Sequence, residues 1–323
     1  MVNLNTPITT IIFSGLSKFE PYQTLEIWQT ISFILYTGII LWFSYIYKTN
    51  MSLTKFIWSF SLAGFWHTIV LGQIYIFLFA LIATAWISLL QNRNFWAGVA
   101  IGALIAIKPN FALWPIFLFF SGYYATFFVA ALTCVAISLI PLIRFGTHIY
   151  QQWFEASALE YQTLIMPGNN SILGLTARFD QITIGIVISI LTTIFLLLLS
   201  RGNNNRTAGN IERVSGLSII ASLLASPLAW TGYTIFLLPI YFSREKWGNF
   251  IIASAVILTI PFALVLQFFQ NSYFYFVIFG WLYGWAIILL LWELLKKDTP
   301  LLIMLPGFFS TKFSAILQRL RKP

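Results

Sequence analysis

The sequence predicts an all-α, polytopic transmembrane helical bundle. Of its 323 residues 59% are hydrophobic and only 8% are charged, whereas soluble domains carry about 25% charged residues. The mean hydropathy is +0.85. The apolar runs are continuous rather than alternating, which excludes a β-barrel. So few charges cannot cover a soluble globule, and the composition therefore excludes a soluble enzyme, a disordered chain and a secreted disulfide scaffold.

Ten apolar segments follow one another along the chain, and several are shorter than the roughly 20 residues that a full span needs. Their approximate bounds are 25–47, 53–70, 74–90, 95–107, 111–121, 124–143, 182–199, 214–242, 250–268 and 274–295. The segment 214–242 can cross twice if it breaks near Ser226–Gly232, so we expect ten or eleven spanning or broken helices. Breaks at Lys108-Pro109 and Ser226-Pro227 predict backbone that faces protein or a water-filled cavity.

The basic residues predict the orientation in the membrane. Fourteen of the eighteen Lys and Arg residues lie in the loops 48–55, 91–94, 201–213 and 244–247 or beyond residue 295. Cytoplasmic loops carry such an excess of cations. We therefore expect a multi-pass protein of a plasma membrane, such as a bacterial inner membrane, with a cytoplasmic C-terminus. The net charge of +9 reflects this topology and not nucleic acid as a partner.

Two parts of the chain are expected. Residues 1–298 form a transmembrane domain, and residues 299–323 form a basic amphipathic cytoplasmic tail. The tail has the composition of an interfacial helix. An ordinary positive-inside tail is the favoured interpretation, because Pro306-Gly307 interrupts the pattern.

Four polar clusters fall on the outer side in this topology: His67–Gln73, Ile107–Asn110, the loop Arg144–Gln181 and Ala225–Tyr233. Lys108 stands between two apolar runs, where a cation is costly in lipid, and its compact ammonium suits a phosphate. The alternative is a lysine that extends to the membrane surface from a helix end.

Several other polar residues leave two interpretations open. Gln73 can hydrogen-bond a sugar hydroxyl or the broken backbone, and Trp230 can stack on a sugar or lie in the interfacial aromatic belt. Glu155 and Glu160 are weak candidates for a general base. They would lie about 140° apart on a helix, and a solvated helix face is the favoured interpretation.

No metal or cofactor is expected. The two histidines are far apart in sequence and lack an acidic partner nearby, and the single Cys134 provides neither a disulfide within the chain nor a cysteine metal site. The chain also carries no P-loop or GxGxxG nucleotide motif.

Five short motifs occur in a fixed order between about residues 5 and 240. They are Gly72-Gln73; Trp96-Ala97-Gly98 with Gly102; Ile107-Lys108-Pro109; Gly168-Asn169-Asn170-Ser171 with Gly174-Leu175 and Arg178; and Ser226-Pro227-Leu228-Ala229-Trp230 followed by Leu238-Pro239. This ordered set resembles the polyprenol-phosphate-mannose-dependent mannosyltransferases of glycosyltransferase family 87, in the GT-C superfamily.

The resemblance implies a GT-C type bundle that transfers a hexose, mannose in that family, from a polyprenyl-phosphate sugar. The acceptor would be a lipid or glycan on the outer face, and membrane lipids would be the other partners. The donor-binding residues implied by the resemblance are Gln73, Lys108, Asn170, Ser171, Arg178 and Trp230. Lys108, Asn170, Ser171 and Arg178 would stabilise charge on the departing phosphate. No nucleotide or redox cofactor is implied.

Two departures from the family pattern matter. Many family members carry a His pair after the Ser-Pro-x-x-Trp motif, where this chain has Gly232-Tyr233. GT-C enzymes place a catalytic acid in the first outer loop, and the stretch from Asn5 to Trp28 resembles the segment that comes directly after that loop. The acid is therefore expected upstream of Met1. The alternatives are a transporter of a lipid carrier or solute, which also uses broken helices, and a non-catalytic, truncated remnant of the enzyme.

Overall fold

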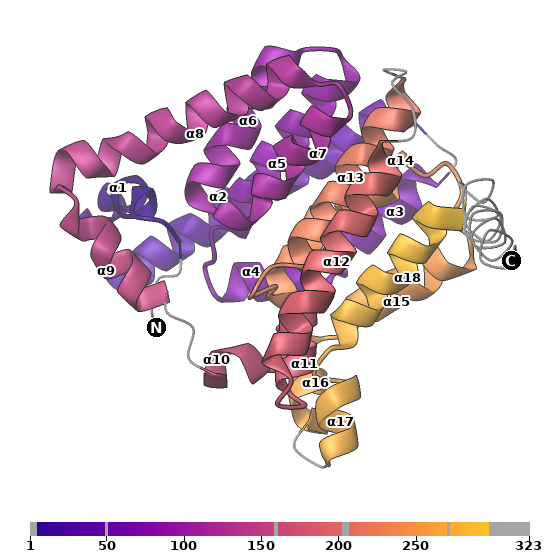
Figure 1. Ribbon diagram of the computed structural model, residues 1–323. Helices are drawn as coiled ribbons and strands as arrows, with labels where there is room; N and C mark the ends of the chain where they lie inside the picture. The colour runs from indigo at the N-terminus through magenta and orange to yellow at the C-terminus, as the bar shows by residue number, and fades with distance from the viewer. Residues whose placement is uncertain (1–4, 49–50, 158–160, 202–206, 270–271, 297–323) are drawn as a thin grey trace, which may run out of the picture.

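In the computed structural model, the residues 5–48, 51–157, 161–201, 207–269 and 272–296 are described, and every regular element in these ranges is a helix (Figure 1). The predicted all-α class is therefore confirmed. The first half of the chain contains α1 (Ile8–Ser14), η1 (Leu16–Lys18), α2 (Pro21–Ile46), α3 (Ser52–Phe60), α4 (Ala63–Val70), α5 (Tyr75–Leu90), α6 (Asn94–Ile107), η2 (Pro109–Ala112), α7 (Leu113–Phe120) and α8 (Tyr124–Phe145).

The second half begins with three short helices and continues into the long α12. Its elements are α9 (His148–Ser157), α10 (Tyr161–Ile165), α11 (Ile172–Ala177), α12 (Ile182–Ser200), α13 (Ala208–Leu224), η3 (Thr231–Leu237), α14 (Leu238–Ser243), α15 (Asn249–Thr259), α16 (Phe262–Phe269), α17 (Tyr273–Ile278) and α18 (Leu282–Lys296). The segment expected at 214–242 breaks where proline predicts it, at Ser226-Pro227, and the expected segments 95–107 and 111–121 are separated at Lys108-Pro109.

Few helices reach the length of a full membrane span. Within the described residues, α2, α8 and α12 are long and apolar enough to cross, and a fourth crossing results if α15 and α16, which meet at an 82° bend, are counted as one. The expected ten or eleven spans are therefore not confirmed as full-length helices. The predicted tail, 299–323, lies outside the described residues.

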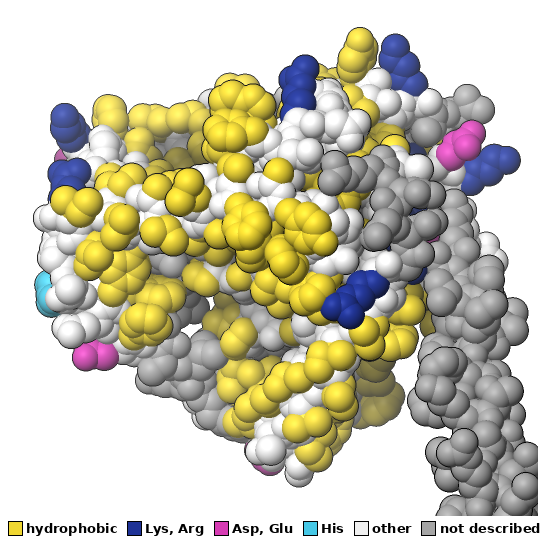
Figure 2. All heavy atoms as spheres, turned by 45° about the horizontal axis from the view of Figure 1, so that its top comes forward, with side chains coloured by type: hydrophobic (Ala, Val, Ile, Leu, Met, Phe, Trp, Pro, Cys, Tyr) yellow, Lys and Arg dark blue, Asp and Glu magenta, His cyan; other side chains and the backbone are white. Residues whose placement is uncertain are grey.

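Helix α13 forms the centre of the bundle, and every residue from Val214 to Leu224 is buried. From Val214 onward this helix carries no charged side chain and has no face that needs water, as is typical of a core helix. In contrast, α8 and α12 expose many large apolar side chains, as helices that face lipid do. Figure 2 shows apolar side chains spread over one face of the molecule, with most of the Lys and Arg side chains toward its edges.

Helices α6 and α8 pack closely because two glycines of α6 lie at the contact. A Cβ on Gly98 would lie 2.6 Å from the Cβ of Val129, and one on Gly102 would lie 2.5 Å from the carbonyl oxygen of Ala130. Small residues four positions apart allow two helix backbones to approach in a membrane. This packing holds α6 firmly up to the break at its end.

The bundle has two chemically different ends. At one, the basic end, the Nζ atom of Lys55 donates to the carbonyl oxygens of Phe242 and Arg244, at 3.2 and 2.5 Å. Arg213 there donates to the carbonyl oxygen of Leu199 at 2.8 Å. At the same end, the Tyr47 hydroxyl directly after α2 accepts from the indole N–H of Trp86 near the end of α5 and donates to Glu212 near the start of α13. The breaks at Ser226 and Lys108 follow the far ends of α13 and α6.

Candidate active site

Helix α6 ends at Ile107 because the next two residues are a Lys-Pro pair. The residue before a proline is pushed out of the helical region, and Lys108 has φ −133° and ψ 91°. Thr6 then caps the helix, since its hydroxyl donates to the carbonyl oxygen of Ala106 and its backbone N–H to that of Ile107, at 3.4 Å for the latter. Proline at the start of η2 needs no hydrogen bond for its nitrogen, and the chain resumes as η2 and α7.

The Lys108 side chain points into the protein and is only 7% exposed. Its Nζ atom lies 5.6 Å from the ring centre of Tyr233 and 5.9 Å from that of Tyr75. Within the described residues no carboxylate pairs with it. Burial contradicts the interpretation of a lysine extended to the membrane surface. A buried cation that lies beside two aromatic rings and has no carboxylate partner in the described residues has unused capacity for an anion.

The turn between α4 and α5 places Tyr75 against this lysine. Gly72 has φ +60°, a conformation that favours glycine, and the N–H of Gln73 donates to the carbonyl oxygen of Thr68 at 2.9 Å. Gln73 is partly buried two residues before Tyr75. The structure therefore places the start of α5, which directly follows the first polar cluster, beside Lys108 of the second.

Gly232 explains one departure from the family pattern. A Cβ at this position would lie 2.5 Å from Cδ2 of Tyr75 and 2.9 Å from Oγ1 of Thr68. The ring of Tyr75 thus occupies the space that a larger residue at 232 would need. The rings of Tyr75 and Tyr233 meet edge to face with centres 4.7 Å apart.

The third and fourth clusters are joined by hydrogen bonds. The backbone N–H of Asn170 donates to the carbonyl oxygen of Ala229 at 2.8 Å, and its Nδ2 donates to those of Gly168 and Ala229 at 2.7 and 3.2 Å. The Ser171 hydroxyl donates to the carbonyl oxygen of Pro227 and accepts from the N–H of Gly174, capping α11. Both side chains therefore hold two loops together, although Oδ1 of Asn170 is buried without a partner.

The key residue of this junction is Asn169, which the sequence analysis did not select as a site residue. It is fully buried. Its Nδ2 donates to the carbonyl oxygens of Leu164 and Pro227, and its Oδ1 accepts from the N–H groups of Ala229 and Ser171. No single-sequence signal distinguishes the two neighbouring asparagines, because their directions depend on the turn at Gly168, which has φ +83°.

Arg178, the residue directly after α11, stabilises the same loop. It is 3% exposed, and its guanidinium donates to the carbonyl oxygens of Ile165, Met166 and Asn169. Burial lowers the pKa of this guanidinium to about 10, so it is charged at neutral pH. Its Nη1 is buried without a partner. Arg178 therefore chiefly stabilises the loop, and its Nη1 remains able to donate to a ligand.

The remaining predicted site residues are Trp230, Glu155 and Glu160. Trp230 is partly buried against the core directly before η3. Glu155 is exposed on α9, and Glu160 lies outside the described residues. Within the described ranges no group of three His, Cys, Asp or Glu side chains gathers in a way that could hold a metal.

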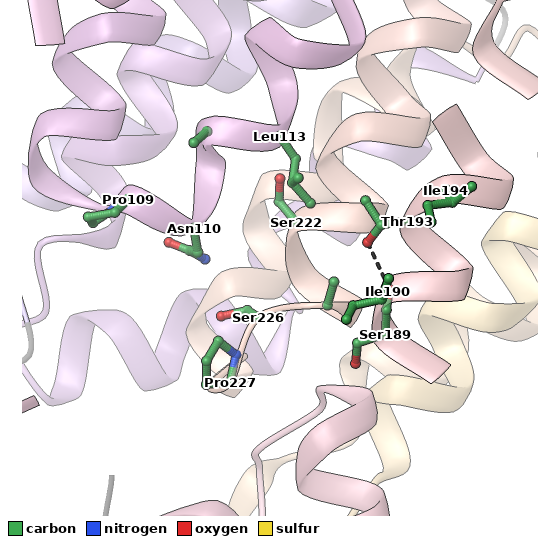
Figure 3. A pocket seen from close by; sticks show the side chains of 12 residues that line it. Pro109, Asn110, Leu113, Ser189, Ile190, Thr193, Ile194, Ser222, Ser226 and Pro227 are labelled. Atoms are coloured by element: carbon green, nitrogen blue, oxygen red, sulfur yellow. Dashed lines mark hydrogen bonds between the residues drawn. The ribbon is translucent and has the colours of Figure 1, made fainter. Parts of the chain in front are cut away.

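A cavity of about 410 Å³ lies between η2, the middle of α12 and the end of α13 (Figure 3). Its lining residues are Pro109, Asn110, Ala112, Leu113, Ser189, Ile190, Thr193, Ile194, Ser222, Ala225, Ser226 and Pro227. None of them is charged. The cavity begins at the residue after Lys108, yet the Lys108 side chain is not part of its wall.

The model of one protein family matches residues 3–227, which is more than two thirds of the chain, and its description is glycosyltransferase family 87. The chain belongs to glycosyltransferase family 87. The matched part of this family 87 protein contains Lys108, the Asn169–Ser171 loop and all twelve residues that line the cavity. No curated protein and no solved structure gives a significant match.

Membership of family 87 confirms the family inferred from the motifs. Together with the apolar helices it makes the chain a membrane glycosyltransferase, whose work needs a sugar donor, an acceptor and contact with lipid. The sequence alone does not select Tyr75, or Tyr233 of the fourth polar cluster, as site residues beside Lys108, because aromatic residues in apolar helices are too common to stand out. It does not select Ser189 and Ser222 of the cavity either, because serines are also common in such helices.

Proposed function

We propose that this family 87 protein transfers a hexose, namely mannose, from a polyprenyl-phosphate sugar to a lipid or glycan acceptor at the outer face of a plasma membrane. The observation that carries the proposal is Lys108, a buried cation without a carboxylate partner in the described residues, placed where α6 breaks. A phosphate on an apolar carrier is a substrate that can reach such a cation from lipid and benefit from it.

The chemistry is a displacement at the anomeric carbon. The oxygen of the acceptor hydroxyl forms a bond to that carbon while the bond from the carbon to the phosphate oxygen breaks. The carrier phosphate leaves with the electron pair, and the hydroxyl proton passes to a carboxylate base. Lys108 stabilises the negative charge that grows on the phosphate, in a site from which water is largely excluded.

The other donor-binding residues support this reaction in different ways. Gln73 and Trp230 lie two and three residues before the two tyrosines beside Lys108, and each would contact the sugar. Asn170 keeps Oδ1 and Arg178 keeps Nη1 without partners, so each has one group to offer the donor. Ser171 uses its hydroxyl to cap α11 and contributes by fixing the loop.

The experiment measures transfer in membranes that contain the protein. Polyprenyl phosphate carrying radiolabelled mannose is supplied, and label in extracted lipid and glycan is counted. Lys108→Ala is expected to reduce transfer at least 100-fold, as removal of one charge-stabilising donor does. Lys18→Ala, an exposed lysine near α2, is the matched control and should leave transfer unchanged.

Two results would contradict the proposal. If Lys108→Ala transfers label as fast as the wild type, the lysine does not act on the donor. If the wild-type protein only moves the labelled lipid across vesicle membranes and leaves the sugar attached, the protein is a transporter.

A further inference from the structure

We propose that the cavity between η2, α12 and α13 binds the uncharged, hydroxyl-bearing head of the acceptor lipid, and that the donor phosphate lies on the other side of the break, at Lys108. The acceptor role rests on the proposed function. The binding of an uncharged lipid head in this cavity rests on the structure and is tested separately.

The position of the cavity gives access from the lipid side. Ile190 and Ile194 form one wall and are 54% and 48% exposed on α12, whose surface is apolar. The volume of about 410 Å³ falls in the range of small-molecule sites. It is too small for a whole glycolipid and large enough for one head group with the start of its chain.

Three hydrogen-bonding groups in the wall have no partner. These are Nδ2 of Asn110 and the hydroxyls of Ser189 and Ser222, all buried. Ser189 is 7% exposed and Ser222 is fully buried. Buried polar groups in native proteins are almost always paired. An unpaired set in the wall of one cavity indicates that a ligand supplies the missing partners.

The neighbouring serines of α13 differ from Ser222 in this respect. The Ser215 hydroxyl accepts from the indole N–H of Trp114 at 3.2 Å, and the Ser218 hydroxyl donates to the carbonyl oxygen of Ser215 at 2.8 Å. Both are satisfied inside the protein. Ser222, one turn further along at the cavity wall, is not.

The absence of charge in the wall selects the kind of head group. No lining residue can neutralise a phosphate, and an unpaired buried charge is strongly unfavourable. A sugar or alcohol hydroxyl suits the site, because it can donate to a serine oxygen and accept from the amide nitrogen of Asn110. The remaining wall, made largely of proline, alanine, leucine and isoleucine, suits an apolar chain.

Lys108 and Asn110 then separate the two substrates. Lys108 contacts Tyr75 and Tyr233, whereas Asn110 lies in the cavity wall and projects from η2 toward Ser226 (Figure 3). In the chain only Pro109 lies between these two residues. In the proposed arrangement, a hydroxyl bound at Asn110 attacks the anomeric carbon of a sugar whose phosphate is bound at Lys108.

The test is photolabelling of the purified full chain in nanodiscs with dodecyl mannoside that carries a diazirine in its alkyl chain. Label is expected on peptides that contain residues 109–113 and 189–194. Unlabelled dodecyl mannoside should compete, and dodecyl phosphate should not. The double variant Asn110→Ala/Ser222→Ala should reduce labelling about tenfold. Ser218→Ala, on the same helix with its hydroxyl paired internally, is the matched control and should label like the wild type.

Several outcomes would overturn the inference: label elsewhere in the chain, equal competition by dodecyl phosphate, or unchanged labelling of a double variant that melts like the wild type. If that double variant does not fold, labelling of the wild type at the two peptides and the competition pattern decide. Labelling as expected in a protein that transfers no sugar would support this binding site and refute the proposed function. Sugar transfer that depends on Lys108, together with label outside these two peptides, would support the proposed function and refute this binding site.

Discussion

The ammonium of Lys108 lies 5.6 Å from the ring centre of Tyr233, and Tyr75 approaches the same ammonium from a second side at 5.9 Å. A desolvated contact of this kind is worth about 2 kcal/mol. Tyr233→Leu is therefore expected to lower transfer about tenfold in the radiolabel assay, since Tyr75 remains. Tyr233→Phe keeps the ring and should stay close to the wild type. An equally large loss in Tyr233→Phe would show that the hydroxyl, and not the ring, is needed.

Asn169 is expected to matter for folding more than Asn170. Asn169→Ala removes four buried hydrogen bonds and leaves their backbone partners unsatisfied, a loss of about 3 kcal/mol. Asn170→Ala removes two side-chain bonds and should cost about half as much. Thermal unfolding in detergent compares the two variants. A lower melting temperature for Asn170→Ala than for Asn169→Ala would contradict this order.

The close contact between α6 and α8 predicts that a glycine-to-alanine substitution destabilises the protein at one position and not at another. In Gly102→Ala the new Cβ would lie 2.5 Å from the carbonyl oxygen of Ala130, so the helices must separate, at a cost of about 1–3 kcal/mol. Gly38→Ala in α2 meets no atom within 4 Å and should leave the melting temperature unchanged or higher. Equal melting temperatures for the two variants would refute this account of the packing.

Lys55 is expected to stabilise the basic end. Its side chain is fully buried, and Lys55→Met removes the donor to the carbonyl oxygens at the end of α14. Hydrogen bonds to charged groups contribute about 1.5–3 kcal/mol, so the melting temperature should fall clearly. Lys48→Met is the control, because Lys48 is exposed and lies over the ring of Tyr45. A matching shift in both variants would mean that charge alone is responsible.

The orientation in the membrane can be tested with two cysteines at opposite ends of the bundle. In a Cys134→Ser background, Gln181→Cys before α12 and Gln91→Cys after α5 both place the thiol at an exposed position. The positive-inside rule places the basic end in the cytoplasm. An impermeant thiol reagent on intact cells should therefore label the cysteine at 181 and leave that at 91 unlabelled. The reverse pattern would overturn the proposed orientation.

The breaks that create the site were predictable, whereas many of the helix lengths were not. Proline lacks a backbone N–H and restricts the residue before it, which is why Lys108-Pro109 and Ser226-Pro227 predict the ends of α6 and α13. The segment expected at 53–70 instead divides between α3 and α4 at Ser61 and Leu62, where no proline or glycine gives a signal. Apolar composition alone does not say where such a helix turns.

The site itself was only partly predictable. Lys108 could be selected because a cation between apolar runs has an evident energetic cost. Its neighbours come from η3 and from the start of α5, and their meeting depends on close packing at Gly232. The different hydrogen-bond partners of the Asn169 and Asn170 side chains depend on the backbone conformation at Gly168. Such relations arise from tertiary contacts, which one sequence without an alignment does not reveal.

The indole N–H of Trp281 donates to the carbonyl oxygen of Ser171 at 2.8 Å, and the N–H of Gly168 donates to that of Gly280 at 3.2 Å. Both bonds reach across the limit of the family match at residue 227. A gene fragment designed on that limit would lose one half of each bond and cut the loop that Asn169 holds. Chimeras between relatives, and shortened forms of this protein, should therefore keep the chain through α18 as one unit.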